Sequence, residues 1–357
     1  MVTVWVGFIA FVLLMLALDL GVFHRSAHVV SVREALKWSG IWIAMGLTFS
    51  VFVYFAYENH WFGLGLVADA VDDVINDGAS AMEKYLTGYL VEKSLSVDNI
   101  FVISIIFSAF AVPAIYQHRV LFWGILGALV MRGVMIGVGA KLVADFHWIL
   151  YVFAAFLIFT GIKMLFFKSG DVDPNDNLVM RTLRRWIPVT ERFHGEHFVV
   201  RAGTPAAQLS AVVGEGALPD PVVSSARPGT LLLTPLAAAL VMVETTDVIF
   251  AVDSIPAIFA ITSDPFLVFT SNVFAILGLR SLYFALAGMS QKFRYLDVAL
   301  AVILLLVGAK MLFAHWLKLM LGGHFNLYFL GVVVVTLAIG VVSSLLADRT
   351  SAARPIT

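Results

Sequence analysis

The sequence contains no cysteine and few charged residues. None of its 357 residues is a cysteine, which excludes disulfide bonds, iron–sulfur clusters and zinc sites built from thiolates. Asp, Glu, Lys and Arg together make up 13% of the chain, roughly half the share found in soluble globular proteins. A metal bound by this chain must therefore rely mainly on oxygen or imidazole ligands.

Apolar residues dominate instead. They make up 61% of the chain, with 29 Phe and 8 Trp, and the mean hydropathy is +0.94. A helix needs about 20 mainly apolar residues to cross a bilayer. The sequence predicts an all-α polytopic membrane protein with nine spans, at about 2–23, 38–57, 86–110, 119–140, 147–167, 231–255, 265–288, 296–316 and 327–346. The first span has no basic residue before it and no small-residue cleavage site, so we expect it to be retained.

Two connections between the spans are long. In residues 58–85, four acidic residues alternate with Val and Ile, a spacing that suits an amphipathic surface helix with a solvated acidic face. Residues 168–230 carry His194 and His197 and a stretch rich in Pro, Gly and Ser. There we expect a small extramembrane hairpin or helix with solvated histidines. The chain therefore divides into an N-terminal segment (1–85), a first three-helix unit (86–167), the loop (168–230), a second three-helix unit (231–316) and a final span with its tail (317–357).

The distribution of Lys and Arg predicts the orientation, because cytoplasmic loops are enriched in both. With the N-terminus outside, the inside segments contain fifteen of these residues and the outside segments contain three. We therefore expect both the 168–230 loop and the C-terminus to face the cytoplasm.

Two parts of the sequence repeat. GIKMLF at 161–166 returns as GAKMLF at 308–313, and DNIFV at 98–102 matches DVIFA at 247–251. Between them, ILGALVMR and ILGLR both end in an arginine, Arg132 and Arg280. Spans three to five thus match spans six to eight with opposite orientation. Such inverted repeats are typical of secondary transporters, whose substrate site lies near the midplane between the repeats.

Charged residues interrupt the first helix of each repeat. EKSLSVDNIFV and ETTDVIFAVDSIP place five carboxylates in or beside the spans, namely Glu92, Asp98, Glu244, Asp247 and Asp253. Each carboxylate costs about 2.5–3.5 kcal/mol near the bilayer centre, so five would cost on the order of 10–15 kcal/mol without compensation. Pro256 predicts a broken or kinked helix whose carbonyls are freed. We therefore expect a site for a hard cation with oxygen ligands.

Other polar residues are secondary candidates. Asn99, Ser254 and Asn272 could add oxygen ligands, and Asn272 could equally form only a hydrogen bond between helices. Asp19 could be a ligand, but an interfacial carboxylate paired with Arg25 is the simpler interpretation. Lys93, Arg132 and Arg280 could balance the charge of an empty site. The alternative is that these cations form buried ion pairs that only fix helix packing.

The motifs resemble those of a known family. GYLVEKSLSVDNIFV (88–102), TPLAAALVMVETTDVIFAVDSIPAIFAITSDPFLVFTSN (234–272) and FAILGLRSLYF (274–284) are similar to the TerC family of integral membrane proteins, as are ALDLGVFHR and REALKWSGIW near the N-terminus. This family is named for tellurium resistance and belongs with LysE-type exporters. The resemblance implies manganese export, with the family's acidic positions at Glu92, Asp98, Glu244, Asp247 and Asp253.

The residues predict a multi-pass transporter of the bacterial cytoplasmic membrane for a hard divalent cation such as Mn²⁺, Ca²⁺ or Mg²⁺, working by alternating access, with proton antiport as the coupling reaction. The resemblance implies that the cation is Mn²⁺ and that it is exported. We expect the cation and the lipid bilayer as its partners, no nucleic acid, no organic cofactor and no enzymatic activity. One alternative is a membrane partner or assembly protein that confers tellurium or stress resistance indirectly. The other is a metal-dependent membrane enzyme, which is disfavoured because no His or Ser nucleophile accompanies the carboxylates.

Overall fold

The computed structural model describes residues 2–18, 31–166, 188–208, 220–286, 295–313, 316–317, 320 and 325–352. Asp19 and Arg25, predicted as an interfacial pair, lie outside these residues. Each of the nine predicted spans coincides with a helix, or with two helices at 265–288. The helices are α1 (Val2–Leu18), α2 (Val32–Glu58), η2 (Trp61–Gly63), α3 (Gly78–Ala109), α4 (Ala114–Asp145), α5 (Ile149–Phe166), α7 (Pro205–Gln208), α8 (Pro221–Ser225), α9 (Pro235–Phe259), α10 (Pro265–Leu277), α11 (Leu279–Leu286), α12 (Leu296–Leu312) and α14 (Phe325–Ala352).

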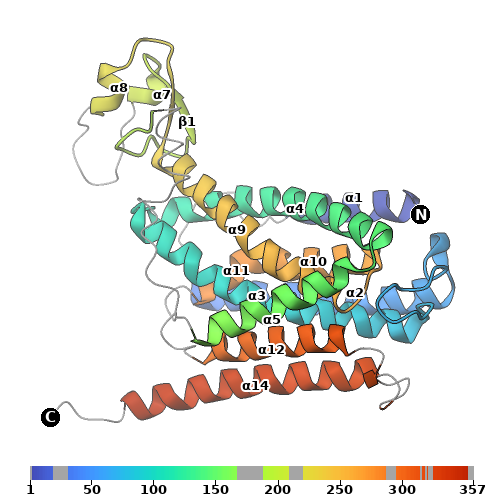
Figure 1. Ribbon diagram of the computed structural model, residues 1–357. Coiled ribbons are helices and arrows are strands. Elements are labelled where there is room, and N and C mark those ends of the chain that lie inside the picture. The colour runs from blue at the N-terminus through green and yellow to red at the C-terminus, as the bar shows by residue number, and fades with distance from the viewer. Residues whose placement is uncertain are drawn as a thin grey trace.

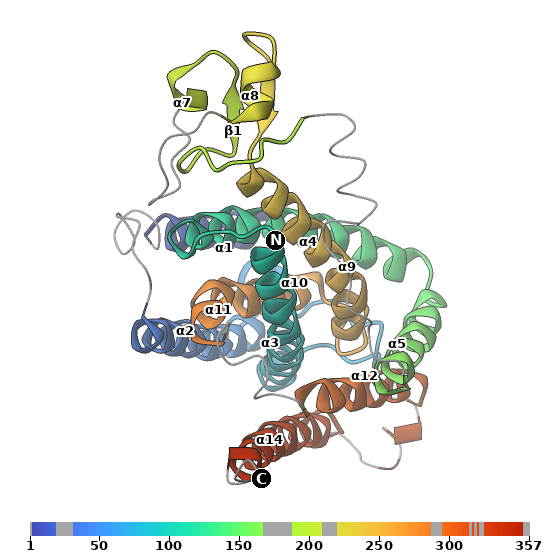
Figure 2. The same cartoon turned by 90° about the vertical axis from the view of Figure 1, so that its left-hand side faces the viewer.

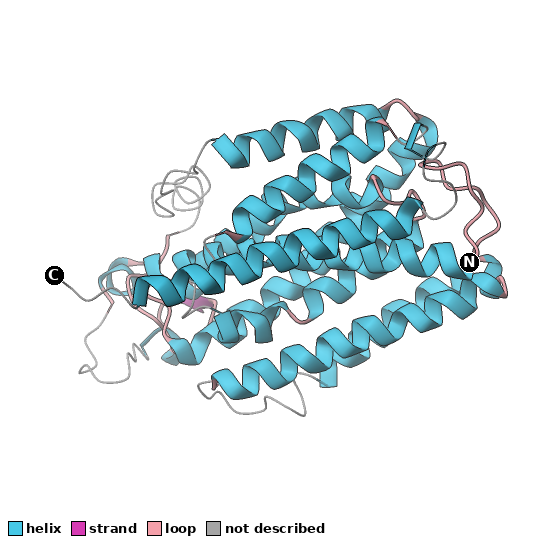
Figure 3. Cartoon of the chain, turned by 90° about the horizontal axis from the view of Figure 1, so that it is seen from below, coloured by secondary structure: helices cyan, strands magenta, loops and turns pink. Residues whose placement is uncertain are grey.

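The helices confirm the predicted fold class. Among the described residues, six segments are long and apolar enough to cross a membrane, and α1 and residues 298–312 of α12 are shorter apolar helices. The long helices lie side by side (Figure 3), and α10 lies among α2, α3 and α4, with which it is in contact (Figure 2). Within an 18-residue stretch of the span formed by α10 and α11, 89% of the residues are buried. The chain is therefore an integral, multi-pass membrane protein.

The two matching halves pack reciprocally. Helix α3 contacts α10, α4 contacts α9, and α5 contacts α12, while α3 and α9 also touch each other. The inverted relation between the halves stays a prediction. Helices α3 and α9, which carry the acidic motifs, lie next to each other in this arrangement.

The bundle has two different ends (Figure 1). At one end, β1 (Val199–Arg201) and β2 (Leu231–Leu233) form a short antiparallel pair; we call residues 188–208 and 220–234 the hairpin unit, and this end the hairpin end. At the other end, residues 59–77 connect α2 to α3; we call them the strap, and this end the strap end. Helix α3 runs from the strap end to the hairpin end, and α9 runs in the opposite direction.

The strap is not the amphipathic helix that the sequence predicts. Apart from η2, it forms turns, with Gly65 at φ 65° and Asp73 at φ 54°. The Val71 N–H donates to Asp69 Oδ1 at 3.0 Å, and the Val74 N–H donates to Asp72 Oδ1 at 3.3 Å. Such local bonds from Asp side chains compete with helix formation. The alternation of apolar and acidic residues therefore reflects a folded loop.

The prediction for the histidines is wrong at His194. Its side chain is buried, and its Nε2 atom lies 3.7 Å from Asp220 Oδ2 within the hairpin unit. Burial lowers the pKa of His194, although the nearby Asp220 carboxylate opposes this shift. His194 is thus part of the small core of the hairpin unit.

The helix break is also at a different place from the one predicted. Pro256 lies in the last turn of α9, which continues to Phe259. The break occurs instead at Gly278, which separates α10 from α11. Helix α9 therefore continues for three residues beyond Pro256, although this proline cannot donate to the carbonyl of Val252.

Candidate functional site

Arg132 connects the four central helices. Its guanidinium, on α4, donates through Nε and Nη2 to the two carboxylate oxygens of Asp247 on α9, at 3.1 and 2.8 Å. Its Nη1 atom donates to Glu92 Oε1 on α3 and to Asn272 Oδ1 on α10, the latter at 3.2 Å. We call these four residues the Arg132 cluster. It brings together one polar side chain from each of α3, α4, α9 and α10.

The cluster is buried. Arg132 and Glu92 are each 1% exposed, and the Asp247 side chain is 12% exposed. A buried charge needs both an opposite charge and hydrogen bonds, and the planar guanidinium suits a bidentate pair with a carboxylate. Arg132 thus pairs with Glu92 and Asp247, as both the charge-balance prediction and the packing alternative require.

The cluster is not fully hydrogen-bonded. Glu92 Oε2 and Asn272 Nδ2 are buried and have no hydrogen-bond partner in the structure. Buried polar atoms without partners are rare, and two such atoms beside one ion pair indicate a place where a further ligand or water would bind. Two carboxylates and one amide oxygen already face the positive charge of Arg132 there.

Lys93 occupies the helix break. Its ammonium donates to the backbone carbonyl of Ala275 at 2.9 Å, in the last turn of α10. A Cβ atom at Gly278 would lie 3.0 Å from Lys93 Nζ and 2.9 Å from Trp42 Cβ. Glycine at this position thus leaves room for the lysine, and Lys93 places a second positive charge on α3 next to Glu92.

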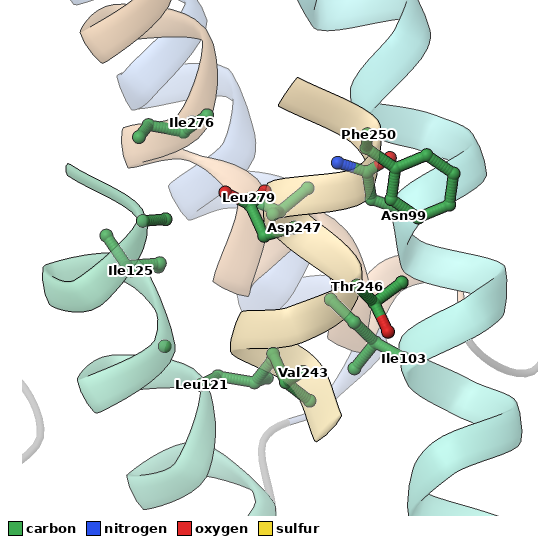
Figure 4. A pocket seen from close by; sticks show the side chains of 12 residues that line it. Asn99, Ile103, Leu121, Ile125, Val243, Thr246, Asp247, Phe250, Ile276 and Leu279 are labelled. Atoms are coloured by element: carbon green, nitrogen blue, oxygen red, sulfur yellow. The ribbon is translucent and has the colours of Figure 1, made fainter. Parts of the chain in front are cut away.

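A small cavity borders Asp247. Its volume is about 30 Å³, room for about one water molecule. Asn99 and Asp247 are its main polar residues, and the remaining wall is largely apolar (Figure 4). The wall of α4 is formed by residues 121–128, which precede Arg132. The cavity therefore lies between the Arg132 cluster and the hairpin end.

Glu244 is held beside α4. A Cβ atom at Gly127 would overlap the Glu244 carboxylate, so a larger residue at this position would displace the end of this side chain. Gly127 and Gly278 occupy the same place in the repeated ILG motifs. Gly127 makes room for an acidic side chain of the other half, and Gly278 makes room for a basic one.

Asp253 lies apart from the Arg132 cluster. Asp253 faces α5, where it accepts a hydrogen bond from Thr160 at 3.3 Å. It follows Asp247 by six residues and therefore points to a different side of the helix. Ser254 is buried, and its hydroxyl has no hydrogen-bond partner in the structure. Asp98 is half-buried and Arg280 is buried. Within the described residues, no three His, Asp or Glu side chains converge to hold a metal ion.

Sequence reasoning missed the buried polar network of the strap. Lys84, taken as a loop residue, belongs to α3, and its side chain is fully buried against Asp69. The spacing offered a signal, since Lys84 lies eight residues before Glu92 and thus near the same face of one helix. Its partners, however, come from loops that periodicity does not describe.

Comparison with known proteins identifies the family. Residues 77–352 match the TerC family of integral membrane proteins. An uncharacterized membrane protein of Myxococcus xanthus, STKORF319, is 45% identical over 88% of this chain and 85% of its own length. Alx of Escherichia coli (strain K12), whose name proposes a membrane-bound redox modulator, is 41% identical over 94% of this chain and 93% of its own. An uncharacterized membrane protein of Rickettsia bellii is 34% identical over 88% of this chain and 89% of its own.

No solved structure shows a significant match to the chain. The family match covers more than half of the sequence, and the relatives extend over nearly its whole length. The chain therefore belongs to the TerC family of integral membrane proteins.

Proposed function

We propose that the protein is a transporter that exports a divalent metal cation, Mn²⁺, across the cytoplasmic membrane. The observation that carries this proposal is the Arg132 cluster, in which oxygens from three helices surround one buried positive charge. Carboxylate and amide oxygens are the ligands that hard divalent cations such as Mn²⁺ prefer. In this interpretation, Arg132 takes the place of the cation while the site is empty.

Alternating access gives the cation a route through the cluster. The Asp247 carboxylate borders a cavity on the hairpin-end side, and Glu244 lies one turn nearer to that end on α9. Reciprocal packing of the two halves suits a rocking motion of α3 and α9. With the N-terminus outside, the hairpin end faces the cytoplasm, so that the cation enters there and leaves at the strap end.

Proton antiport is the proposed coupling reaction. The acidic residues near the site carry more negative charge than one divalent cation neutralises, so protons are expected to replace the departing ion. Outward movement of Mn²⁺ should therefore acidify the cytoplasmic side. A transport rate that does not respond to a pH gradient would contradict the coupling, but not the transport.

A redox role is the competing proposal, because the name of the Escherichia coli relative suggests one. The chain contains no cysteine, so no thiol of its own could take part in electron transfer. Its effect on redox state would then be indirect, as expected if the transported cation acts elsewhere in the cell.

Uptake of Mn²⁺ into inside-out membrane vesicles tests the proposed function. We expect the wild type to accumulate Mn²⁺, and Asp247→Asn and Asp98→Asn to lose at least about tenfold in rate, a change of about 1.4 kcal/mol. Asn keeps the side-chain volume and removes the charge. Asp145→Asn is the matched control, because Asp145 is exposed at the end of α4.

Equal uptake by the wild type, both variants and empty vesicles would contradict the proposal, provided that all proteins insert at equal amounts. The buried carboxylates would then be packing devices, and the protein would act through a partner.

A further inference from the structure

Asp69 in the strap is bound to the turn between α9 and α10. Its Oδ1 atom accepts hydrogen bonds from the backbone N–H and the hydroxyl of Ser263, at 2.8 and 2.7 Å. Its Oδ2 atom accepts one from the Thr262 hydroxyl. The Ala70 N–H donates to Ser263 Oγ at 2.7 Å. The strap is therefore attached to the end of the helix that carries Asp247.

Lys84 joins this attachment to α3. Its ammonium donates to Asp69 Oδ2 at 2.9 Å, to Asp72 Oδ1 at 3.0 Å and to Asn76 Oδ1 at 2.7 Å. The side chains of Lys84 and Asp69 are both 0% exposed. We call Asp69, Asp72, Lys84, Thr262 and Ser263 the latch. It fastens the start of α3 to the end of α9 at the strap end.

The packing between the latch and the Arg132 cluster is tight. A Cβ atom at Gly88 would lie 3.0 Å from Ser271 Oγ, and one at Gly139 would lie 2.6 Å from the Phe259 ring. Gly88 is one turn before Glu92 on α3, and Phe259 is the last residue of α9. On the opposite side of the cluster, the cavity beside Asp247 opens a small space. The strap end also has a cavity, of about 410 Å³, which is lined by Asp69, Asn76 and Ser263; the tight contacts lie between the latch and the cluster.

The latch does not open by protonation at ordinary pH. Burial alone would raise the pKa of Asp69, but the Lys84 ammonium and the hydrogen bonds from Lys84, Thr262 and Ser263 lower it to about 2. The other acidic groups at the latch are Asp72, Glu83 and Asp264, and the other cation is Lys310. Because Asp69 stays ionised, separation of α3 from α9 requires the strap and the turn to move apart.

We propose that the latch is the strap-end gate of the transport path. This inference rests on the proposed function: the path is closed while Asp69 joins Lys84 to the α9–α10 turn, and it opens when these contacts separate. The geometry supports a gate because the latch joins α3 and α9, the two helices that carry Glu92 and Asp247, at the strap end alone. Mobile contacts at the hairpin end would complete the cycle.

A disulfide across the latch tests the gate. The chain has no cysteine of its own, so Ala70→Cys with Ser263→Cys introduces the only pair. Oxidation should lock the gate and abolish Mn²⁺ uptake into inside-out vesicles, and a reducing agent should restore it. Each single variant is a control, as is the pair Arg201→Cys with Leu231→Cys, which face each other across the hairpin and should transport after oxidation.

A second measurement does not depend on transport. Ser271 is buried beside Gly88, so the cysteine of Ser271→Cys should react slowly with a water-soluble thiol reagent. Asp69→Asn should speed this reaction at least about tenfold, whereas Asp145→Asn should not. If the wild type transports no Mn²⁺ but Asp69→Asn makes Ser271→Cys reactive, the proposed function is wrong. The opening of the strap end on loss of the latch contacts is then still supported. Mn²⁺ uptake by the fully oxidised Ala70→Cys/Ser263→Cys protein would overturn the proposal that the latch is a gate. Equal reactivity of Ser271→Cys in the Asp69→Asn and Asp145→Asn proteins would overturn it as well.

Discussion

At the scale of the residue, Arg132 decides how the acidic helices are held together. Its guanidinium bridges Glu92 of the first half and Asp247 of the second, so that the same charge stabilises both. Removing one partner of a buried ion pair costs about 3–5 kcal/mol. The cost arises because the remaining charges stay buried without compensation.

Arg132→Gln should therefore unfold at a lower temperature than the wild type, and Mn²⁺ should restore part of the difference. Mn²⁺ would compensate the charge of the carboxylates that have lost the guanidinium as a partner. A ligand that binds only the folded state raises the free energy of unfolding. Thermal unfolding in detergent, with and without Mn²⁺, measures both effects. We expect Mn²⁺ to raise the melting temperature of Arg132→Gln by more than that of the wild type.

Arg119→Gln is the control for this comparison. Its ion pair with Glu196 is roughly half exposed, with side-chain exposures of 42% and 48%, and exposed pairs contribute only about 0–1 kcal/mol. If Mn²⁺ raises the melting temperature of Arg132→Gln and of the wild type by the same amount, the cluster does not bind the ion.

At the scale of the element, one glycine of α4 sets where the Glu244 side chain of α9 lies. Gly127 leaves the space that the Glu244 carboxylate fills. Gly127→Ala should displace this carboxylate and lower Mn²⁺ uptake by at least about tenfold, corresponding to about 1.4 kcal/mol. The measurement is the initial rate at equal amounts of folded protein.

Gly137→Ala is a matched control on the same helix. Nothing lies within 4 Å of a Cβ atom added there, and alanine favours the helix over glycine by about 1 kcal/mol. Gly137→Ala should therefore transport at the wild-type rate. If both glycine variants behave alike, the position of Glu244 does not matter for transport.

The helices could be predicted from the sequence, but their polar connections could not. Runs of apolar residues located most of the helices, because a bilayer imposes a length and a composition on each span; α3 carries too many charged residues to be found in this way. The acidic motifs also pointed to α3 and α9, and the Arg132 cluster joins Glu92 and Asp247 of these helices. Asp253 was counted among the five ligands, yet it faces Thr160 on α5.

Tertiary contacts explain what the sequence did not predict. The acidic alternation in the strap suggested a surface helix, whereas Asp69 is buried by contacts with residues about 190 positions away. No local pattern encodes such a partner. The break at Gly278 likewise depends on Lys93 and Trp42, which approach it from other helices.

At the scale of the whole molecule, the direction of transport depends on which end of the bundle faces the cytoplasm. The excess of Lys and Arg predicts that the hairpin end does, because basic segments are retained on the cytoplasmic side. The cavity beside Asp247 would then be the cytoplasmic entrance, and the latch would close the path on the outside.

Single cysteines in the cysteine-free chain test this orientation directly. Val67 in the strap is 72% exposed, and Ser225 is exposed in the hairpin unit. A maleimide that does not cross membranes should label Val67→Cys in intact cells, and should label Ser225→Cys only after the cells are permeabilised. The reverse pattern would place the latch on the cytoplasmic side. The cavity beside Asp247 would then lie on the outer side of the Arg132 cluster, and the proposed entry of the cation from the cytoplasm through this cavity would be wrong.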